Sequence, residues 1–517
     1  MRKMSRFRRY FLNYIFPAVL ISSVTGALTG AVITLYKFCA SHVIGFSEKG
    51  YQFMGENPYW LPVIVAALFA VAFFYSKCYQ KYPNLQGGGI PTSVGILRGL
   101  ISFDWLKNLI GTFSLSLLSF FIGVPLGNEG PSVQIGTAIG RAGAKLFGKK
   151  ASAWSRYSMT GGACAGFSVA TGAPISGVVF SVEEAHRRVS PLIVIVSSVS
   201  VVSAVVVSNL LSPLLGVETS LFPEFELVSL STKDMWIPVI LGVLSGLFAV
   251  AFLKYYRVVS SFIKKKLKKV SHTARIFSVF ALTVIAGLVS HEFVSTGHEV
   301  VLGLFEESTP VLWLVLILAV RSTLTLSANS SGVTGGLFVP MLAIGALFAA
   351  IAGRGIQSVF ALDESYFVVM LLLGITACIA GMMKMPVTAV IFAVEALSCY
   401  KNVLPVIIVS ATAYVITEIF KAESINDVVL ENKVNNLNKG KIPQTVEEYV
   451  TVKDGSFAVG KHIRDILWPP SLFVLSMKHN GKPEEDAGEI CGGDTLYVRY
   501  KTTDIKHTKE ELDKIIL

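Results

Sequence analysis

Gly127-Asn128-Glu129-Gly130-Pro131 places an acidic residue between the apolar segment Leu109 to Val124 and a helix expected to open at Pro131. Proline is favoured in the first turn of a helix, and the glycines before it leave free backbone N–H groups close together. These donors and the helix dipole can form a site for an anion. A carboxylate at Glu129 can occupy that site and can vacate it when protonated, which would couple an anion to a proton. The alternative is that Glu129 only caps the helix, but an acid within a membrane is costly and usually functional.

Two further stretches have the same character. Gly335-Gly336-Leu337-Phe338-Val339-Pro340 and Gly87-Gly88-Gly89-Ile90-Pro91 also combine glycines with a proline at a helix start. Each is a weak turn signal by itself, but all three offer backbone amides. Three such helix starts in one apolar region predict a buried anion site.

An internal repeat surrounds these stretches. Pro174-Ile-Ser-Gly-Val-Val-Phe-Ser-Val-Glu183 matches Pro386-Val-Thr-Ala-Val-Ile-Phe-Ala-Val-Glu395 at an offset of 212 residues. The helix starts at Pro131 and Pro340 are 209 residues apart, which is nearly the same register. We therefore expect two homologous halves, about 1–225 and 226–430. Inverted repeats with discontinuous helices are a transporter architecture.

The composition is that of a polytopic membrane protein. Of 517 residues, 52% are hydrophobic and 15% are charged, against roughly 25% charged in soluble domains. Long apolar segments alternate with shorter ones broken by Gly and Pro, which are tolerated at membrane depth only where protein or a water-filled cavity surrounds them. The net charge of +11 comes from clusters beside apolar segments, namely Arg2 to Arg9, Lys77 to Lys81, Arg141 to Arg156 and Lys254 to Arg275. Such clusters mark the cytoplasmic side of a membrane protein and give no support for nucleic-acid binding.

The sequence gives no sign of an enzyme, a metal site or a bound cofactor. The six cysteines lie far apart without CxxC pairs or a histidine spacing that would bind zinc, so we interpret them as reduced packing residues. No catalytic triad or nucleotide-binding loop is recognisable, because the glycine-rich stretches open membrane helices and are not followed by a βαβ unit.

The composition becomes polar after Ile419. Residues 431–445 are polar and are expected to form a linker. Residues 446–517 alternate between apolar and polar positions, with Gly455, Pro469-Pro470, Asn480-Gly481 and Gly492-Gly493 as turns. This pattern predicts a small β-rich soluble domain, which pairing between subunits would help to stabilise.

Glu183 and Glu184 are a second pair of candidate functional acids. Two adjacent carboxylates at a membrane boundary suit a proton relay. The alternative is a solvated helix end, which His186, Arg187 and Arg188 support. Glu395, the repeat mate of Glu183, is expected to be structural.

Taken together, the three helix starts, their order and the Glu183-Glu184 pair resemble the CLC family of chloride channels and anion/proton antiporters, over about Tyr10 to Leu430. The resemblance implies an all-α fold of two inverted-topology halves with broken helices, and a homodimer with a separate pore in each subunit. It also implies that Glu129 is an external gating glutamate and Glu184 an inner proton-transfer group. The anion-binding positions that it implies are Gly88, Gly89, Ile90, Asn128, Gly130, Leu337, Phe338 and, by a looser match, Asn426.

Three departures bear on the anion. The family's chloride-type pattern has serine at Gly88, arginine at Asn128 and tyrosine near Asn426. Two hydroxyl donors are therefore missing, which weakens the case for chloride because a buried anion needs its hydrogen bonds satisfied. The pattern resembles the fluoride/proton antiporter branch, so we expect fluoride export in exchange for protons. A chloride/proton antiporter and a passive voltage- or pH-gated chloride channel are the alternatives.

The tail resembles the C-terminal regulatory domain of potassium-transport proteins, through Gly455-Ser456, Gly460-Lys461, Ile463 and Gly493-Asp494. That resemblance implies a small ligand, such as a cyclic dinucleotide, at a dimer interface; a dimer-stabilising appendage is the other interpretation. Both chain termini are expected on the cytoplasmic side of the cell membrane.

Overall fold

The fold is that of a computed structural model, which describes residues 11–147, 153–225, 227–266, 269–306, 309–438, 442–479, 482–483 and 488–517. The predicted basic cluster Arg2 to Arg9 and the predicted turn Asn480-Gly481 lie outside these residues. Parts of the clusters Arg141 to Arg156 and Lys254 to Arg275 also lie outside them.

Helices form almost the whole described chain up to Leu437. The first half contains α2 (Phe16–Glu56), α3 (Leu61–Lys81), α4 (Ile90–Leu97), α5 (Trp105–Ile122), α6 (Glu129–Leu146), α7 (Ser155–Thr171), α8 (Pro174–Phe180) and α9 (Pro191–Leu215). The second contains α10 (Trp236–Lys266), α11 (His272–Val289), α12 (His298–Glu306), α13 (Val311–Ser331), α14 (Phe338–Phe360), α15 (Tyr366–Cys378), α16 (Pro386–Ala396), α17 (Val403–Ile419) and α18 (Ile425–Leu437). Ten helical stretches among the described residues are long and apolar enough to cross a membrane, which agrees with the predicted polytopic architecture.

Helix length separates the spanning elements from the broken ones. At 1.5 Å per residue, a helix needs about 20 residues to cross hydrocarbon roughly 30 Å thick. Helix α2 has 41 residues and exceeds that span, whereas α4 has eight and α8 has seven. The short helices therefore end inside the helical body, as the Gly and Pro pattern predicts.

The two halves are built alike, which confirms the internal repeat. Helix α2 packs on α9 and α6 on α7, just as α10 packs on α17 and α14 on α15. Helices α8 and α16, which carry the repeated sequence, pack on each other. An antiparallel bridge joins Gly127 to Gly336, the corresponding positions just before α6 and α14.

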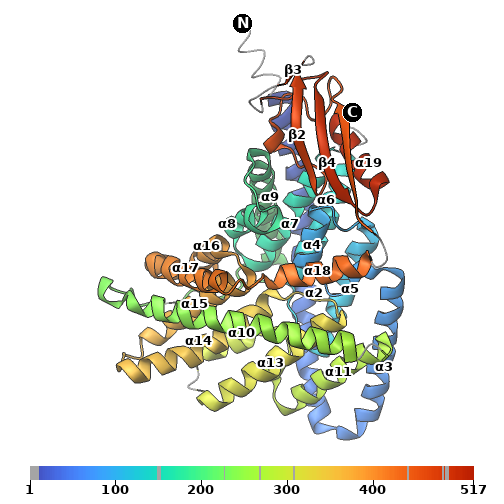
Figure 1. The fold of residues 1–517 in the computed structure, drawn as a ribbon. Helices are drawn as coiled ribbons and strands as arrows, with labels where there is room; N and C mark the ends of the chain where they lie inside the picture. Colours follow the sequence, from blue (N-terminus) through green and yellow to red (C-terminus); the bar gives the residue numbers. More distant parts are fainter. Residues whose placement is uncertain are drawn as a thin grey trace.

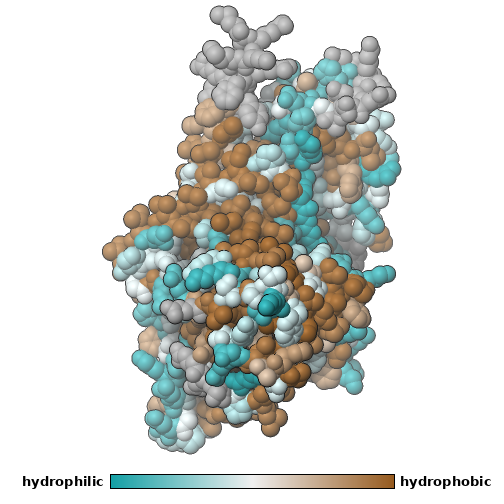
Figure 2. All heavy atoms as spheres, turned by 90° about the vertical axis from the view of Figure 1, so that its left-hand side faces the viewer, coloured by the Kyte–Doolittle hydropathy of each residue, from teal (hydrophilic) through white to brown (hydrophobic). Residues whose placement is uncertain are grey.

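The outer surface of the helical body is strongly apolar. On α3, Phe69, Phe73 and Phe74 are each about half exposed. Figure 2 shows hydrophobic side chains over much of the helical body on one face. Such a surface is suited to lipid and would be a liability in water.

The C-terminal residues form a separate small domain at one end of the helical body (Figure 1). Its antiparallel sheet has the order β1-β4-β2-β3, with β1 Gln444–Thr451, β2 Leu472–His479, β3 Lys482–Pro483 and β4 Thr495–Thr502. Helix α19 (Ile505–Ile516) adds Leu512 to a core that includes Leu496 and Val498. Helix α18 extends to Leu437, so residues 431–437 of the predicted linker are helical.

One segment of this domain, residues 457–468, is hydrogen-bonded to the helical body; we call it the docking segment. Arg156 at the start of α7 donates to the carbonyls of Leu467 (3.0 Å) and Trp468 (2.6 Å). The Tyr157 hydroxyl donates to the Asp465 carbonyl and accepts from the Leu467 amide, both at 3.0 Å. Further bonds reach the docking segment from Tyr14, Arg188 and Ser190. The small domain is therefore fixed to the helical body.

Candidate functional site

The three glycine-rich helix starts converge at the centre of the helical body. Gly127 and Gly336 exchange backbone hydrogen bonds of 2.8 and 2.7 Å, and the Gly87 amide donates to the Gly332 carbonyl at 2.8 Å. A Cβ atom on Gly89 would lie 2.6 Å from the Cα of Gly130. Only glycine permits this approach, which brings the N-termini of α4, α6 and α14 together.

Glu129 reaches from α6 toward the first turn of α14. Its side chain is buried, and its carboxylate faces the backbone amides of Glu129 itself and of Val339. Its Oε2 atom lies so close to Gly127 that a Cβ there would be 2.5 Å away. Among the described residues this oxygen has no hydrogen-bond partner of standard geometry. The carboxylate therefore lies where the N-termini of α6 and α14 meet, and only one of its two oxygens is hydrogen-bonded within the described residues.

The amides of α14 are available on the other side of this point. Leu337 is the N-cap residue and Phe338 opens the helix, and both are buried. The first amides of a helix have no partner within it. The ring of Phe338 packs edge-on against Phe167 (5.1 Å between centroids) and Phe392 (5.4 Å), so an apolar wall adjoins the amide donors.

The start of α4 differs from the prediction. The Gly89 amide, predicted as an anion donor, donates instead to Gln134 Oε1 at 3.0 Å. Gln134 in turn donates to Asn108 Oδ1 at 3.2 Å. A Cβ on Gly88 would lie 3.3 Å from the same Gln134 oxygen, so the Gln134 side chain fills the space into which a side chain at position 88 would extend. Gly130 and Ile90 are buried at the convergence, and Asn128 is the half-buried N-cap residue of α6.

Glu184 lies in a second cluster of polar residues. It is buried, and the Asn426 side-chain amide donates to its Oε1 at 3.0 Å. Arg187 approaches its Oε2 at 3.8 Å and pairs with Asp427 at 2.6 Å. Arg98, which follows α4, donates to the Glu184 carbonyl at 2.7 Å. Asn426, predicted as an anion ligand, is thus hydrogen-bonded to the Glu184 carboxylate.

Glu183 lies in a different environment from its neighbour. Its carboxylate accepts from the amides of Val387 (2.9 Å) and Thr388 (2.7 Å) and from the Thr388 hydroxyl (2.6 Å), at the N-terminus of α16. The Glu395 carboxylate likewise accepts from the amides of Ile175 and Ser176 and from the Ser176 hydroxyl, at the N-terminus of α8. Both oxygens of Glu183 cap a helix, so the structure favours Glu184 over Glu183 as the candidate for proton transfer, and the relay pair stays a prediction.

Sequence reasoning missed two polar residues at the centre. Gln134 is buried on α6, and Lys37 is a half-buried residue of α2. Lys37 also donates to the carbonyls of Val169 (3.3 Å) and Glu218 (2.8 Å). An amide and an ammonium group on otherwise apolar helices were the available signals.

Comparison with known proteins identifies the family of this architecture. The H(+)/Cl(-) exchange transporter ClcA of Vibrio parahaemolyticus is 26% identical over 432 residues, covering 81% of this chain and 91% of that protein. ClcA of Salmonella arizonae is also 26% identical, covering 80% and 88%.

Solved structures share the fold. A slow cyanobacterial Cl-/H+ antiporter aligns with a TM-score of 0.73 at 24% identity, covering 82% of this chain and 99% of the other. A CLC-type fluoride/proton antiporter aligns with a TM-score of 0.63 at 19% identity, covering 78% and 96%. The family model described as voltage gated chloride channel matches residues 71–418, more than half of the chain, and the chain therefore belongs to this family, the CLC family.

Proposed function

We propose that this chain is a secondary active transporter that exchanges a small anion for protons. The position of Glu129 carries the proposal. A buried carboxylate, one oxygen of which has no hydrogen-bond partner among the residues that the structure describes, lies at the joined N-termini of α6 and α14, where amide donors and helix dipoles favour an anion. The carboxylate and the transported anion would compete for these donors, and protonation of Glu129 would release them to the anion.

Glu184 is the proposed inner proton-transfer group. It is a buried acid held by one neutral amide donor from Asn426 and by a longer contact to Arg187. Glu183 is not part of this step, because its carboxylate caps α16. A passive channel would not need an inner acid of this kind, so the two separate carboxylates support exchange.

Chloride is the first candidate for the anion. Both of the named sequence relatives given above are H(+)/Cl(-) exchange transporters. The donors that we propose for it are the backbone amides of Ile90, Gly130, Leu337 and Phe338.

Fluoride is the second candidate. Gly88 offers no hydroxyl, Asn128 replaces an arginine of the chloride-type pattern, and the Asn426 amide is bound to Glu184. A site made mainly of backbone amides would suit a small, strongly hydrated anion that needs short contacts.

Flux from proteoliposomes tests the proposal. Vesicles containing the purified chain are loaded with chloride or with fluoride, and the external pH is recorded. An outward gradient of the transported anion should drive protons uphill, and Glu129→Gln should abolish proton movement while anion flux continues. Glu224→Gln, which alters an exposed carboxyl, is the reconstitution control. Unchanged proton coupling in Glu129→Gln would refute the mechanism, and faster fluoride than chloride exchange would reverse the order of the candidates.

The assembly and orientation are also proposals. Tyr14 near the start of the chain donates to the Val459 carbonyl in the C-terminal domain, so both ends of the described chain lie at one side of the helical body. Arg141 and Arg156 lie at that same side, which the positive-inside rule makes cytoplasmic. We propose a homodimer in the cell membrane whose C-terminal domain is a regulatory unit, with a cyclic dinucleotide as a candidate ligand at the domain pair.

A further inference from the structure

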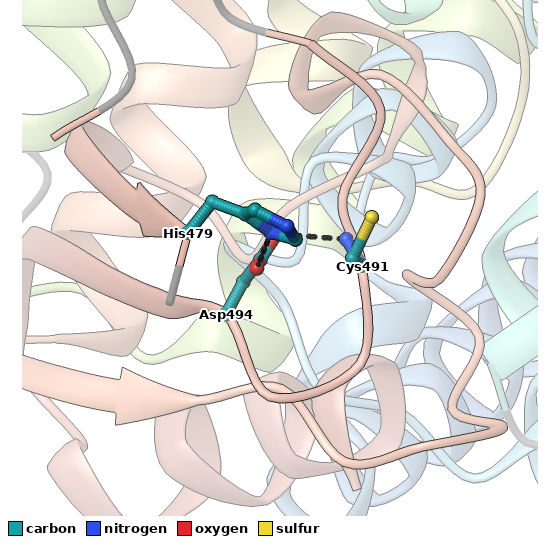
Figure 3. Close-up of side chains that lie close together, drawn as sticks. All are labelled: His479, Cys491 and Asp494. Carbon is teal, nitrogen blue, oxygen red and sulfur yellow. Dashed lines mark hydrogen bonds and ion pairs between the residues drawn. The ribbon is translucent and has the colours of Figure 1, made fainter. Parts of the chain in front are cut away.

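The C-terminal domain brings together His479 and, 12 and 15 residues further along the chain, Cys491 and Asp494. His479 ends β2, Asp494 immediately precedes β4, and Cys491 lies in the loop before it. Because Lys478 pairs with Thr495 in the sheet register, the end of β2 and the start of β4 are neighbours. Figure 3 shows the three side chains gathered at this edge.

The chemistry of the group is that of a transition-metal site. One potential ligand atom from each residue lies within 4.8 Å of the other two. Imidazole nitrogen, thiolate sulfur and carboxylate oxygen are the three ligand types that proteins use for zinc. Calcium and magnesium prefer all-oxygen sites, so this set selects a borderline or soft cation.

The buried carboxylate supplies an independent argument. Asp494 is fully buried, and its only ion-pair partner among the described residues is His479, at 2.6 Å from Nδ1 to Oδ1. Its other oxygen accepts from the Cys491 amide at 2.7 Å. Burial of a carboxylate is unfavourable without a cation, so a bound metal ion would offset the burial of Asp494.

The thiol is placed differently from the other cysteines. Cys491 is the only exposed one of the six, all of which are described. Its Sγ donates weakly to the Glu489 carbonyl at 3.7 Å. An exposed thiol contributes little packing, so the packing role predicted for the cysteines does not extend to Cys491.

We propose that His479, Cys491 and Asp494 bind one divalent transition-metal ion of the zinc type. The metal inserts between His479 Nδ1 and Asp494 Oδ1, and a neutral imidazole that binds it through Nδ1 carries its proton on Nε2. The Cys491 thiol loses its proton to solvent on binding. A fourth position stays open to water.

Metal binding at this edge would act on the docking segment. The Gly460 amide donates to the Ile490 carbonyl at 2.7 Å, and the Ile490 amide donates to the Lys461 carbonyl at 2.9 Å. A metal on Cys491 fixes the loop that makes these two bonds. The same segment contacts the helical body through Tyr14 and Tyr157, so metal occupancy would strengthen the attachment of the domain to the transporter.

Cobalt binding to the purified full-length chain in detergent provides the test. We expect one Co²⁺ per chain with a thiolate-to-cobalt absorption band, and Zn²⁺ should displace it. Cys491→Ser should abolish the band, whereas Cys78→Ser, a half-buried cysteine on α3, should leave it unchanged. His479→Asn should weaken Zn²⁺ binding by at least about tenfold, since even outer partners of metal ligands are worth 10–100-fold.

Two further measurements keep the proposal falsifiable. X-ray absorption of the zinc-loaded chain should show one sulfur at about 2.3 Å. Zinc should also slow hydrogen exchange at Gly460 and Ile490, with no change in Cys491→Ser. A band that survives in Cys491→Ser, or equal zinc affinity in the wild type and His479→Asn, would show that Asp494 is only a turn cap and would overturn the proposal.

Discussion

Glu183 and Glu395 are matched by the internal repeat, so each can serve as the control for the other. Each carboxylate accepts three hydrogen bonds from the first turn of the opposite short helix, at 2.6–2.9 Å for Glu183 and 2.7–2.8 Å for Glu395. We expect Glu183→Gln and Glu395→Gln to lower the free energy of unfolding by similar amounts, and neither to remove proton coupling.

The size of the effect follows from these contacts. Glutamine keeps one acceptor oxygen but turns an NH₂ group toward one of the two helix amides. A buried donor left without an acceptor costs about 1–3 kcal/mol. Loss of the negative charge at a helix N-terminus costs a further ~0.3–2 kcal/mol. The expected destabilisation is roughly 2–4 kcal/mol for either variant.

Thermal unfolding in one detergent and proton flux in proteoliposomes measure the two quantities separately. Glu184→Gln is the third variant of the set, and it should lose proton coupling with little change in stability, because the Asn426 amide can still donate to the remaining carbonyl. The reasoning fails if Glu183→Gln unfolds like the wild type but loses proton coupling, since Glu183 would then belong to the relay. It also fails if only one member of the matched pair is destabilised.

Three other perturbations test the Glu184–Asn426 contact and the docking segment. Asn426→Leu removes the donor to Glu184, a bond worth about 1–1.5 kcal/mol, and should slow proton-coupled flux about tenfold. Added to Glu129→Gln, the same substitution should leave the anion flux of that variant unchanged. Burial lowers the pKa of Lys461 to about 6, below the ~10.4 of an unfolded lysine. The unfolded state therefore binds one more proton between these values, and stability should rise with pH by about 1.4 kcal/mol per unit. Lys461→Met should flatten this slope in thermal melts between about pH 7 and about pH 9, and an unchanged slope would contradict the assignment. Tyr157→Phe removes two hydrogen bonds to the docking segment and should speed hydrogen exchange at the Leu467 amide at least about fivefold; equal exchange rates would show that the segment is held by other contacts.

Local sequence pattern was sufficient for the architecture. Apolar segments of spanning length, the broken helices between them and the repeat of Pro174 to Glu183 at Pro386 to Glu395 are all readable along the chain, because lipid demands internal backbone hydrogen bonding and long apolar helices. The position of Glu129 at a helix start could also be predicted locally, because glycine and proline surround it in sequence. Alternation with turn residues similarly predicted the C-terminal sheet.

The partners of each polar side chain required the tertiary structure. Glu183 and Glu184 are adjacent in sequence, but successive residues of the π-helical turn Ser181–Ala185 point in different directions, so one caps α16 and the other meets Asn426, 242 residues away. Gln134 on α6 accepts a hydrogen bond from the Gly89 amide at the start of α4. The sheet register places His479 beside Asp494. Local pattern fixes which segments become helix or strand, whereas hydrogen-bond partners distant in sequence depend on how those segments pack, which no local pattern contains.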